Sequence, residues 1–183
     1  LRAAIVREEA TLLVINKPPG LAVHGGSGVN VGLIETLRAM YDTDRYLELV
    51  HRLDRDTSGL LLVARRASTL RSLHGLLRSN GVDKRYLCLV SGRWPAHLKR
   101  VDAPLEKFAL PSGERRVKVA ATGRQSLTTF RVVTRWSSMT LVEAKPVTGR
   151  THQIRVHCQH AGFPILGDAK YADDAADRLA EPL

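Results

Sequence analysis

Five ionisable side chains fall within residues 51–56 of the sequence, immediately before a turn and an apolar segment. In the stretch HRLDRDTSGLLLVA they are His51, Arg52, Asp54, Arg55 and Asp56. A carboxylate held at the entrance to a buried strand is fixed in place and partly removed from water, which suits it to act as a base or a nucleophile. The residues Asp-Thr-Ser-Gly also favour a turn, so an acid here can equally serve only as a cap.

The two acids of this stretch are expected to differ in role. Asp56 is the better placed to bond the backbone amides of residues 57–59 and so to cap the turn. Asp54 lies one step further from the turn and is better able to face a ligand. An acid between two arginines adds nothing to the binding of phosphates, so we favour a chemical role for Asp54 over a role in phosphate binding alone. Residues 60–63, which follow, are expected to form a buried strand.

A second stretch, GRTHQIRVHCQHAGFP at 149–164, combines histidines with arginines. Apolar side chains at i, i+4 and i+7 predict a helix, with Thr151 as its N-cap and Gly162 and Pro164 at its end. Arg155 then lies away from the apolar stripe. The histidines do not converge on one helix face as paired metal ligands would, so structural hydrogen bonds are expected for His152, His157 and His160.

A third candidate is Tyr86 in KRYLCLV. A lone tyrosine in a predicted strand usually belongs to the core. The basic pair before it, Lys84 and Arg85, suggests that this strand begins near a surface that faces phosphates.

The elements that must position these residues form a mixed set. Apolar spacing predicts helices over 33–41, 68–79 and 151–161, the second with Leu70, Leu73, Leu76 and Leu77 as its inner stripe. Alternation and β-branched residues predict strands over 11–17, 60–63, 84–92, 115–121, 126–136 and 139–147. Strands outnumber helices and do not alternate regularly with them, which favours an α+β fold around an antiparallel or mixed sheet.

The charge of the chain indicates a polyanionic partner. Its 183 residues carry 28 Lys and Arg against 18 Asp and Glu, a net charge of +10. Nucleic acid is the first candidate, and solvated basic faces are the plainer alternative. The two cysteines allow neither a disulfide framework nor a zinc site, and we expect both to be small buried apolar groups in a reducing cytoplasm. No apolar run approaches the length of a membrane span.

Several long motifs resemble those of the RluA-type pseudouridine synthases. They are the HRLD and TSGLLLVA segments of 51–64, NKPPGLAVH at 16–24, KRYLCLV at 84–90 and VTGRTHQIRVHCQHAGFPILGD at 147–168. The resemblance covers nearly the whole chain in the family's order. It implies a mixed, largely antiparallel sheet with helices and loops flanking a central RNA-binding cleft. The implied reaction cuts uracil from its ribose in RNA, rotates it and rejoins it through carbon 5, with no cofactor or metal.

The resemblance also implies roles for single residues. Asp54 matches the catalytic aspartate, and Arg155 matches the basic residue paired with it. Tyr86 matches the tyrosine that stacks on the base and is a candidate for removing the carbon-5 proton. Ile154 matches an apolar residue beside the base, and Arg52 an arginine that enters the RNA as the target nucleotide leaves its stack. From the same motifs, His51 and Arg150 are added as candidates for substrate binding.

The resemblance sets expectations for the whole chain as well. Residues 1–172 are expected to be a bacterial catalytic domain without its last strands and without an N-terminal S4-type domain, and 173–183 a mobile end. Large-subunit ribosomal RNA is the expected substrate, bound by a monomer. The alternatives are an RNA-binding module without catalysis, a synthase acting on transfer RNA, an N-glycosylase and, least favoured, a metal nuclease. Whether Asp54 attacks the sugar or takes a proton from it stays open.

Overall fold

The chain divides into two compact units in the computed structural model, which describes residues 1–26, 31–41, 46–172 and 176. The first unit is Leu1–Val82 and the second is Asp83–Leu183, and each is treated below by itself. The mobile end expected over 173–183 lies outside the described residues, apart from Ala176, which is buried. Among the described residues, no helix is both long and apolar enough to cross a membrane.

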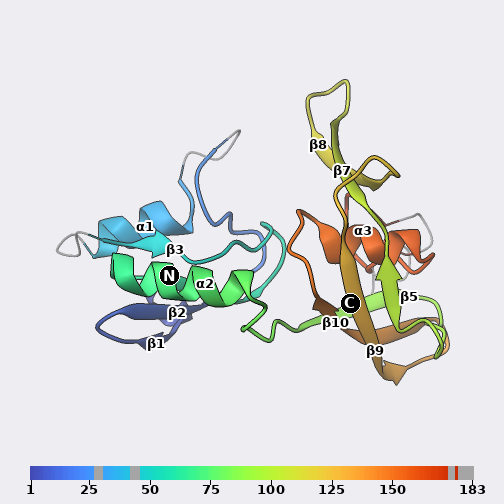
Figure 1. The fold of residues 1–183 in the computed structure, drawn as a ribbon, viewed down its shortest axis with the longest axis horizontal. Coiled ribbons are helices and arrows are strands. Elements are labelled where there is room, and N and C mark those ends of the chain that lie inside the picture. The colour runs from blue at the N-terminus through green and yellow to red at the C-terminus, as the bar shows by residue number, and fades with distance from the viewer. Residues whose placement is uncertain (27–30, 42–45, 173–175, 177–183) are drawn as a thin grey trace. The chain divides into compact units, whose positions relative to one another are not determined.

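The first unit is built on a four-stranded antiparallel sheet in the order β1-β2-β4-β3 (Figure 1). Its strands are β1 (Ile5–Glu8), β2 (Leu12–Lys17), β3 (Glu48–Leu49) and β4 (Gly59–Ala64), preceded by the short 3-10 helix η1 (Arg2–Ala4). Its helices are α1 (Leu33–Met40) and α2 (Ala67–Arg78), close to the predicted bounds. α1 buries its apolar stripe of Leu33, Ile34 and Leu37.

Two predictions of burial in this unit are wrong. Leu61 and Val63 of β4 are fully buried, but Leu60 is 62% exposed, so the strand alternates with a period of two. The expected inner stripe of α2 is only half-buried, and its Leu76 is exposed. β4 is therefore covered on one face only, and none of the residues of α2 is fully buried.

The second unit contains a four-stranded sheet and a two-stranded hairpin, and every paired strand in it is antiparallel. The larger sheet has the order β5-β10-β9-β6, from β5 (Tyr86–Ser91), β6 (Arg100–Asp102), β9 (Leu127–Arg135) and β10 (Met139–Pro146). The hairpin joins β7 (Leu105–Ala109) to β8 (Arg115–Val119), and the last helix is α3 (Gln153–His160). Antiparallel sheets with three α-helices confirm the α+β prediction, although β1, β3, β6 and β7 were not predicted.

The core of the second unit forms between the larger sheet and α3. Trp94 is 1% exposed and packs on Phe130 with ring centroids 4.6 Å apart. Cys88 of β5 and Cys158 of α3 are both buried thiols in this cluster, as the sequence predicted. Val156, on another side of α3, packs into a second cluster with residues of the β7–β8 hairpin. α3 is therefore fixed by apolar contacts along its length.

Candidate active site

The Asp54 segment is a turn between β3 and β4. The N–H of Thr57 donates to the backbone carbonyl of Asp54 at 3.2 Å, which closes a turn with Arg55 and Asp56 at its centre. Leu53, just before the turn, is 7% exposed and anchors the segment in the core. Asp54 itself is half-buried, between that anchor and the exposed centre of the turn. A carboxylate in this place is positioned by its neighbours and still reachable from solvent.

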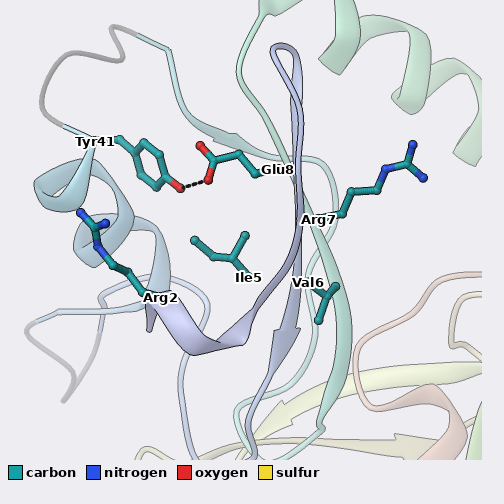
Figure 2. A pocket seen from close by; sticks show the side chains of 6 residues that line it. All are labelled: Arg2, Ile5, Val6, Arg7, Glu8 and Tyr41. Atoms are coloured by element: carbon teal, nitrogen blue, oxygen red, sulfur yellow. Dashed lines mark hydrogen bonds between the residues drawn. The ribbon is translucent and has the colours of Figure 1, made fainter.

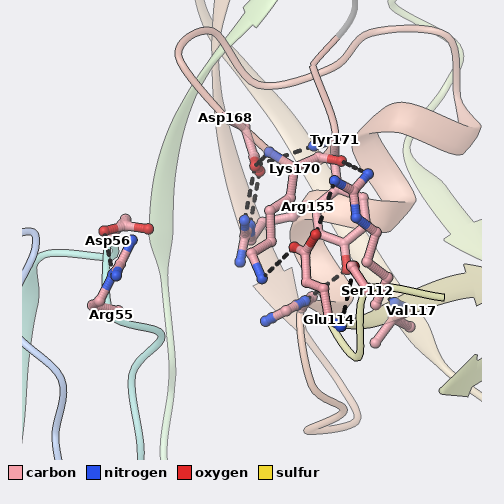
Figure 3. Close-up of polar contacts among 11 residues, drawn as sticks. Arg55, Asp56, Ser112, Glu114, Val117, Arg155, Asp168, Lys170 and Tyr171 are labelled. Carbon is pink, nitrogen blue, oxygen red and sulfur yellow. Dashed lines mark hydrogen bonds and ion pairs between the residues drawn. The ribbon is translucent and has the colours of Figure 1, made fainter. Parts of the chain in front are cut away.

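Asp56 bonds the side chain of its neighbour Arg55, and its described hydrogen bonds include none to the amides that it was expected to cap. Its Oδ1 accepts a hydrogen bond from Nε of Arg55 at 3.2 Å, and the two side chains are 60% and 61% exposed (Figure 3). The predicted cap is therefore wrong, because the exposed carboxylate of Asp56 pairs with Arg55 instead. An ion pair this exposed contributes little to stability.

His51 and Arg52 lie on the irregular segment that leads from β3 into this turn. Nε2 of His51 accepts a hydrogen bond from the N–H of Leu62 at 3.3 Å, and the N–H of Val50 donates to the carbonyl of Leu62 at 2.9 Å. His51 thus ties the segment to β4. Arg52 is exposed and extends from the same backbone.

Tyr86 and Ile154 contact one apolar cluster of the second unit. Tyr86 begins β5 opposite Ala144 of β10, is half-buried, and packs against the cluster that includes Cys88 and Cys158. Ile154, on the first turn of α3, packs against the same cluster. The core side chains therefore pack against both residues and restrict the orientations of the Tyr86 ring and of the Ile154 side chain.

Arg155 is held by a largely buried ion pair with Asp168. Its Nε and Nη2 donate to the two carboxylate oxygens of Asp168 at 2.7 and 2.8 Å, with side chains 16% and 5% exposed (Figure 3). Its guanidinium carbon lies 4.9 Å from the ring centroid of Tyr171. Paired nitrogens and a stacked ring fix the plane of the guanidinium, not only its position.

Asp168 is itself fixed by the backbone. Its Oδ1 also accepts the N–H groups of Lys170 at 3.1 Å and Tyr171 at 3.3 Å. Burial raises the pKa of Asp168, but the hydrogen bonds and charge of Arg155, together with these two amides, outweigh burial and hold the pKa below its usual value. The carboxylate is therefore ionised beside Arg155.

Tyr171 connects this pair to the start of α3. Its hydroxyl accepts the N–H of Val117 at 3.0 Å and is hydrogen-bonded to Nδ1 of His152 at 2.6 Å. His152 is the N-cap residue of α3 and has a left-handed backbone, with φ 53°. The predicted N-cap, Thr151, is wrong by one residue, because the contact with Tyr171 fixes His152 in the cap conformation.

Gln153 ties the same end of α3 to β9. Its Oε1 accepts the N–H of Arg150 at 3.0 Å and the hydroxyl of Thr148 at 2.7 Å, while its Nε2 donates to the carbonyl of Leu127 at 2.9 Å. Nε of Arg150 donates to the carbonyl of Gln125 at 3.3 Å. Arg150 and Arg155 are thus both presented from a helix end that is fixed by hydrogen bonds.

Structural hydrogen bonds were predicted for His152, His157 and His160, and the structure shows them for the first two. His152 bonds Tyr171 as above, and the fully buried His157 bonds Thr128 at 2.9 Å and the carbonyl of Ala103 at 3.1 Å. Burial lowers the pKa of His157, and the bond to Ala103 opposes that effect only in part. His160 is exposed. Within the described ranges, no three His, Cys, Asp or Glu side chains gather as metal ligands.

A separate cavity of about 320 Å³ opens at the N-terminal end of the first unit (Figure 2). Its lining is Arg2, Ile5, Val6, Arg7, Glu8 and Tyr41. The hydroxyl of Tyr41 donates to Glu8 at 2.8 Å, and burial followed by this bond raises the pKa of Tyr41. The predicted site residues are absent from this lining, so the cavity carries none of the expected chemistry.

The candidate residues are therefore distributed over both units. His51, Arg52 and Asp54 share one segment of the first unit. Tyr86, Arg150, Ile154 and Arg155 belong to the second unit, where Ile154 and Arg155 lie on α3 and Arg150 precedes it. Sequence reasoning missed Asp168 and Tyr171, although the segment ILGD at 165–168 lay inside a quoted motif. Asp168 is 13 residues from Arg155, a separation that matches no helix or strand period, so the sequence does not indicate that the fold pairs them.

Comparison with known proteins identifies the family. A sequence model described as RNA pseudouridylate synthase matches residues 11–160. The chain is 57% identical over 178 residues to ribosomal large subunit pseudouridine synthase C of Escherichia coli (strain K12), covering 97% of this chain and 56% of that protein. It is 54% identical over 177 residues to the protein of the same name from Haemophilus ducreyi (strain 35000HP / ATCC 700724), covering 97% and 55%. The chain thus spans about half the length of the curated relatives it matches.

Solved structures agree with the sequence match. Human RNA pseudouridylate synthase domain containing 4 aligns with a TM-score of 0.75 at 30% identity, over 95% of this chain and 70% of that one. Human RNA pseudouridylate synthase domain containing 1 aligns with a TM-score of 0.78 at 26% identity, over 95% and 71%. The chain belongs to the RNA pseudouridylate synthase family.

Proposed function

We propose that this chain isomerises uridine to pseudouridine in large-subunit ribosomal RNA, with Asp54 as the catalytic carboxylate. The observation that carries the proposal is the identity of 57% across 97% of the chain to a relative named for that RNA. The HRLD motif lies inside the matched family region, and its acid is half-buried at a fixed turn.

The proposed reaction rearranges one bond without changing the composition of the RNA. The bond between C1′ of the ribose and N1 of uracil breaks, the ring rotates, and a bond forms between C1′ and C5. The proton on C5 is lost and N1 gains one, so the product is an isomer. Asp54 opens this sequence, either by bonding to C1′ or by taking a proton from the sugar, and both routes need it ionised.

The target base must first leave its stack, which costs a few kcal/mol. We assign Arg52, exposed beside the turn, to the space that the base vacates, with His51 as a further contact from the same segment. Tyr86 and Ile154, both supported by core side chains, are assigned to the flipped base. The hydroxyl of Tyr86 is then the candidate acceptor of the C5 proton.

Arg155 is assigned as the basic partner of Asp54, and Arg150 as a contact to RNA. The bidentate bonds to Asp168 and the ring of Tyr171 support this assignment of Arg155, because they preset the orientation of the guanidinium before substrate arrives. The net charge of +10 favours RNA binding as a whole. We further propose a monomer in the bacterial cytoplasm that needs no cofactor.

The test uses RNA tritiated at C5 of uridine. Wild-type protein is expected to release tritium to water from large-subunit ribosomal RNA and to act more weakly on transfer RNA, and unlabelled RNA should keep its mass. Free uracil in the supernatant would identify an N-glycosylase instead. RNA binding without release of either product would identify a binding module.

A further inference from the structure

Lys17 is a fully buried cation at the end of β2. Its exposed fraction is 0%, and its backbone lies opposite Gly59, the first residue of β4. Burying an ammonium group is costly unless each of its donors finds an acceptor. Lysine is rarely buried to this extent, so its contacts indicate what it does.

Each of the three ammonium hydrogens of Lys17 has a carbonyl acceptor. Nζ donates to the carbonyls of Pro18 at 2.9 Å, Leu21 at 2.9 Å and Arg55 at 2.8 Å. With all three donors used and no exposed surface, Lys17 can neither bind a phosphate of RNA nor pass a proton to a substrate. The role of Lys17 must therefore lie in the backbone carbonyls that its ammonium group binds.

The third acceptor links Lys17 to the Asp54 turn. The carbonyl of Arg55 belongs to the turn that the Thr57 N–H closes onto Asp54. On the other side of Asp54, the buried side chain of Leu53 fixes the backbone. Asp54 thus lies between the buried Leu53 and the Arg55 carbonyl, which accepts a hydrogen bond from the Lys17 ammonium.

The charges around Lys17 agree with this placement. Burial lowers the pKa of Lys17, while the negative charges of Asp56 and Asp54 oppose the shift. The two acids of the turn therefore help to keep the ammonium protonated, and only the protonated form donates to three carbonyls.

We propose that Lys17 is a positioning residue, which holds the Arg55 carbonyl and thereby orients the turn that presents Asp54. The proposal rests on the function proposed above and deepens it. Loss of this anchor leaves the RNA-facing side chains in place but lets the carboxylate move, and a displacement on the scale of 1 Å is enough to slow a reaction by orders of magnitude.

The test compares Lys17→Met with Leu13→Ala in the full chain. Methionine keeps an unbranched apolar side chain and removes the cation. Leu13 is a fully buried residue of the same strand that bonds nothing in the turn, so its truncation controls for lost stability. Pseudouridine formation is measured at a temperature where circular dichroism shows both variants folded. We expect kcat to fall at least tenfold in Lys17→Met with KM within about twofold of wild type, and kcat in Leu13→Ala to stay within about twofold.

Equal kcat values in the two variants would overturn the proposal. A second variant decides the matter where Lys17→Met does not fold: replacing residue 56 by its α-hydroxy analogue turns the Arg55 carbonyl into an ester, a weaker acceptor, while Lys17 stays. We expect a lower kcat there too, and an unchanged kcat would overturn the proposal. A wild-type protein that makes no pseudouridine contradicts the proposed function instead, so the two failures are distinguishable.

Discussion

The pair between Arg155 and Asp168 shows how single residues prepare a charged group for chemistry. The guanidinium has two bonds to one carboxylate and a ring beside it, a geometry that lysine cannot reproduce. Asp168 in turn is held by two backbone amides. The sequence singled out Arg155, to which we assign a chemical role, whereas Asp168 and Tyr171, which hold it, were missed.

We predict that Asp168→Asn destabilises the second unit by about 1–3 kcal/mol at neutral pH, because it removes the negative charge that pairs with the mostly buried guanidinium of Arg155. The folded-state pKa of Asp168 is lowered, so its contribution is complete above the usual carboxyl pKa of about 4 and is lost as pH falls through the lower folded value. Urea unfolding of variant and wild type at pH 7 and pH 3 checks this. A difference that does not shrink at pH 3 would contradict it.

Tyr86→Phe separates the ring from the hydroxyl. The ring keeps its contacts with the core cluster, so stability and RNA affinity should stay close to wild type. If the hydroxyl accepts the C5 proton, turnover should fall by about 100-fold or more. Tyr41→Phe is the matched control, since that hydroxyl bonds Glu8 at the separate cavity. Wild-type turnover in Tyr86→Phe would leave the residue as a stacking platform only.

At the scale of elements, prediction succeeded where local pattern dominates. The stripe that includes Ile154 and Cys158 fixed the position of α3, and alternating apolar residues fixed that of β9 and β10. β1 and β6 were missed because IVRE and RVD are short and rich in charge. The N-cap of α3 was missed by one residue because a tyrosine 19 residues away decides it. Such contacts leave no local trace in a sequence.

The alternation of β4 makes a quantitative prediction. Leu61 is fully buried and Leu60 is 62% exposed, although the two are neighbours of the same type. Leu61→Ala should lower the free energy of unfolding by about 2–4 kcal/mol, and Leu60→Ala should change it by less than about 0.5 kcal/mol. Chemical denaturation of both variants measures the difference. Similar losses would mean that Leu60 is covered in solution.

At the scale of the whole molecule, the charge of +10 is not evenly available to RNA. Arg65 pairs with Glu8 at 3.0 Å, and Arg85 pairs with Asp83 at 2.7 Å. Arg71 and Arg78, by contrast, are exposed on α2. The sequence predicted the polyanionic partner from the sum of charges, but only the fold distinguishes the arginines that already have carboxylate partners.

We predict that log affinity for RNA falls steeply and linearly with log salt concentration, because binding releases counterions from the phosphates. Arg71→Gln combined with Arg78→Gln should reduce the slope by about one to two. Arg65→Gln is the control and should change the slope less. Filter binding or anisotropy across a salt series gives these slopes. A flat plot for the wild-type protein would count against RNA as its partner.

The central claim is that Asp54, and not its neighbour Asp56, performs the chemistry. The two acids belong to one turn, but Asp54 is half-buried between two anchors, while Asp56 is exposed and bonds only its neighbour Arg55 among the contacts described. Changing each to asparagine keeps size and hydrogen-bonding shape, so the pair isolates the negative charge.

The most direct test measures pseudouridine formation by Asp54→Asn and Asp56→Asn in the full chain, with thermal melts alongside. We predict that both variants fold and bind RNA, that Asp54→Asn makes no detectable pseudouridine, and that Asp56→Asn keeps most of its activity with a stability change below about 0.5 kcal/mol. Wild-type activity in Asp54→Asn, or a folded and inactive Asp56→Asn, would contradict the assignment.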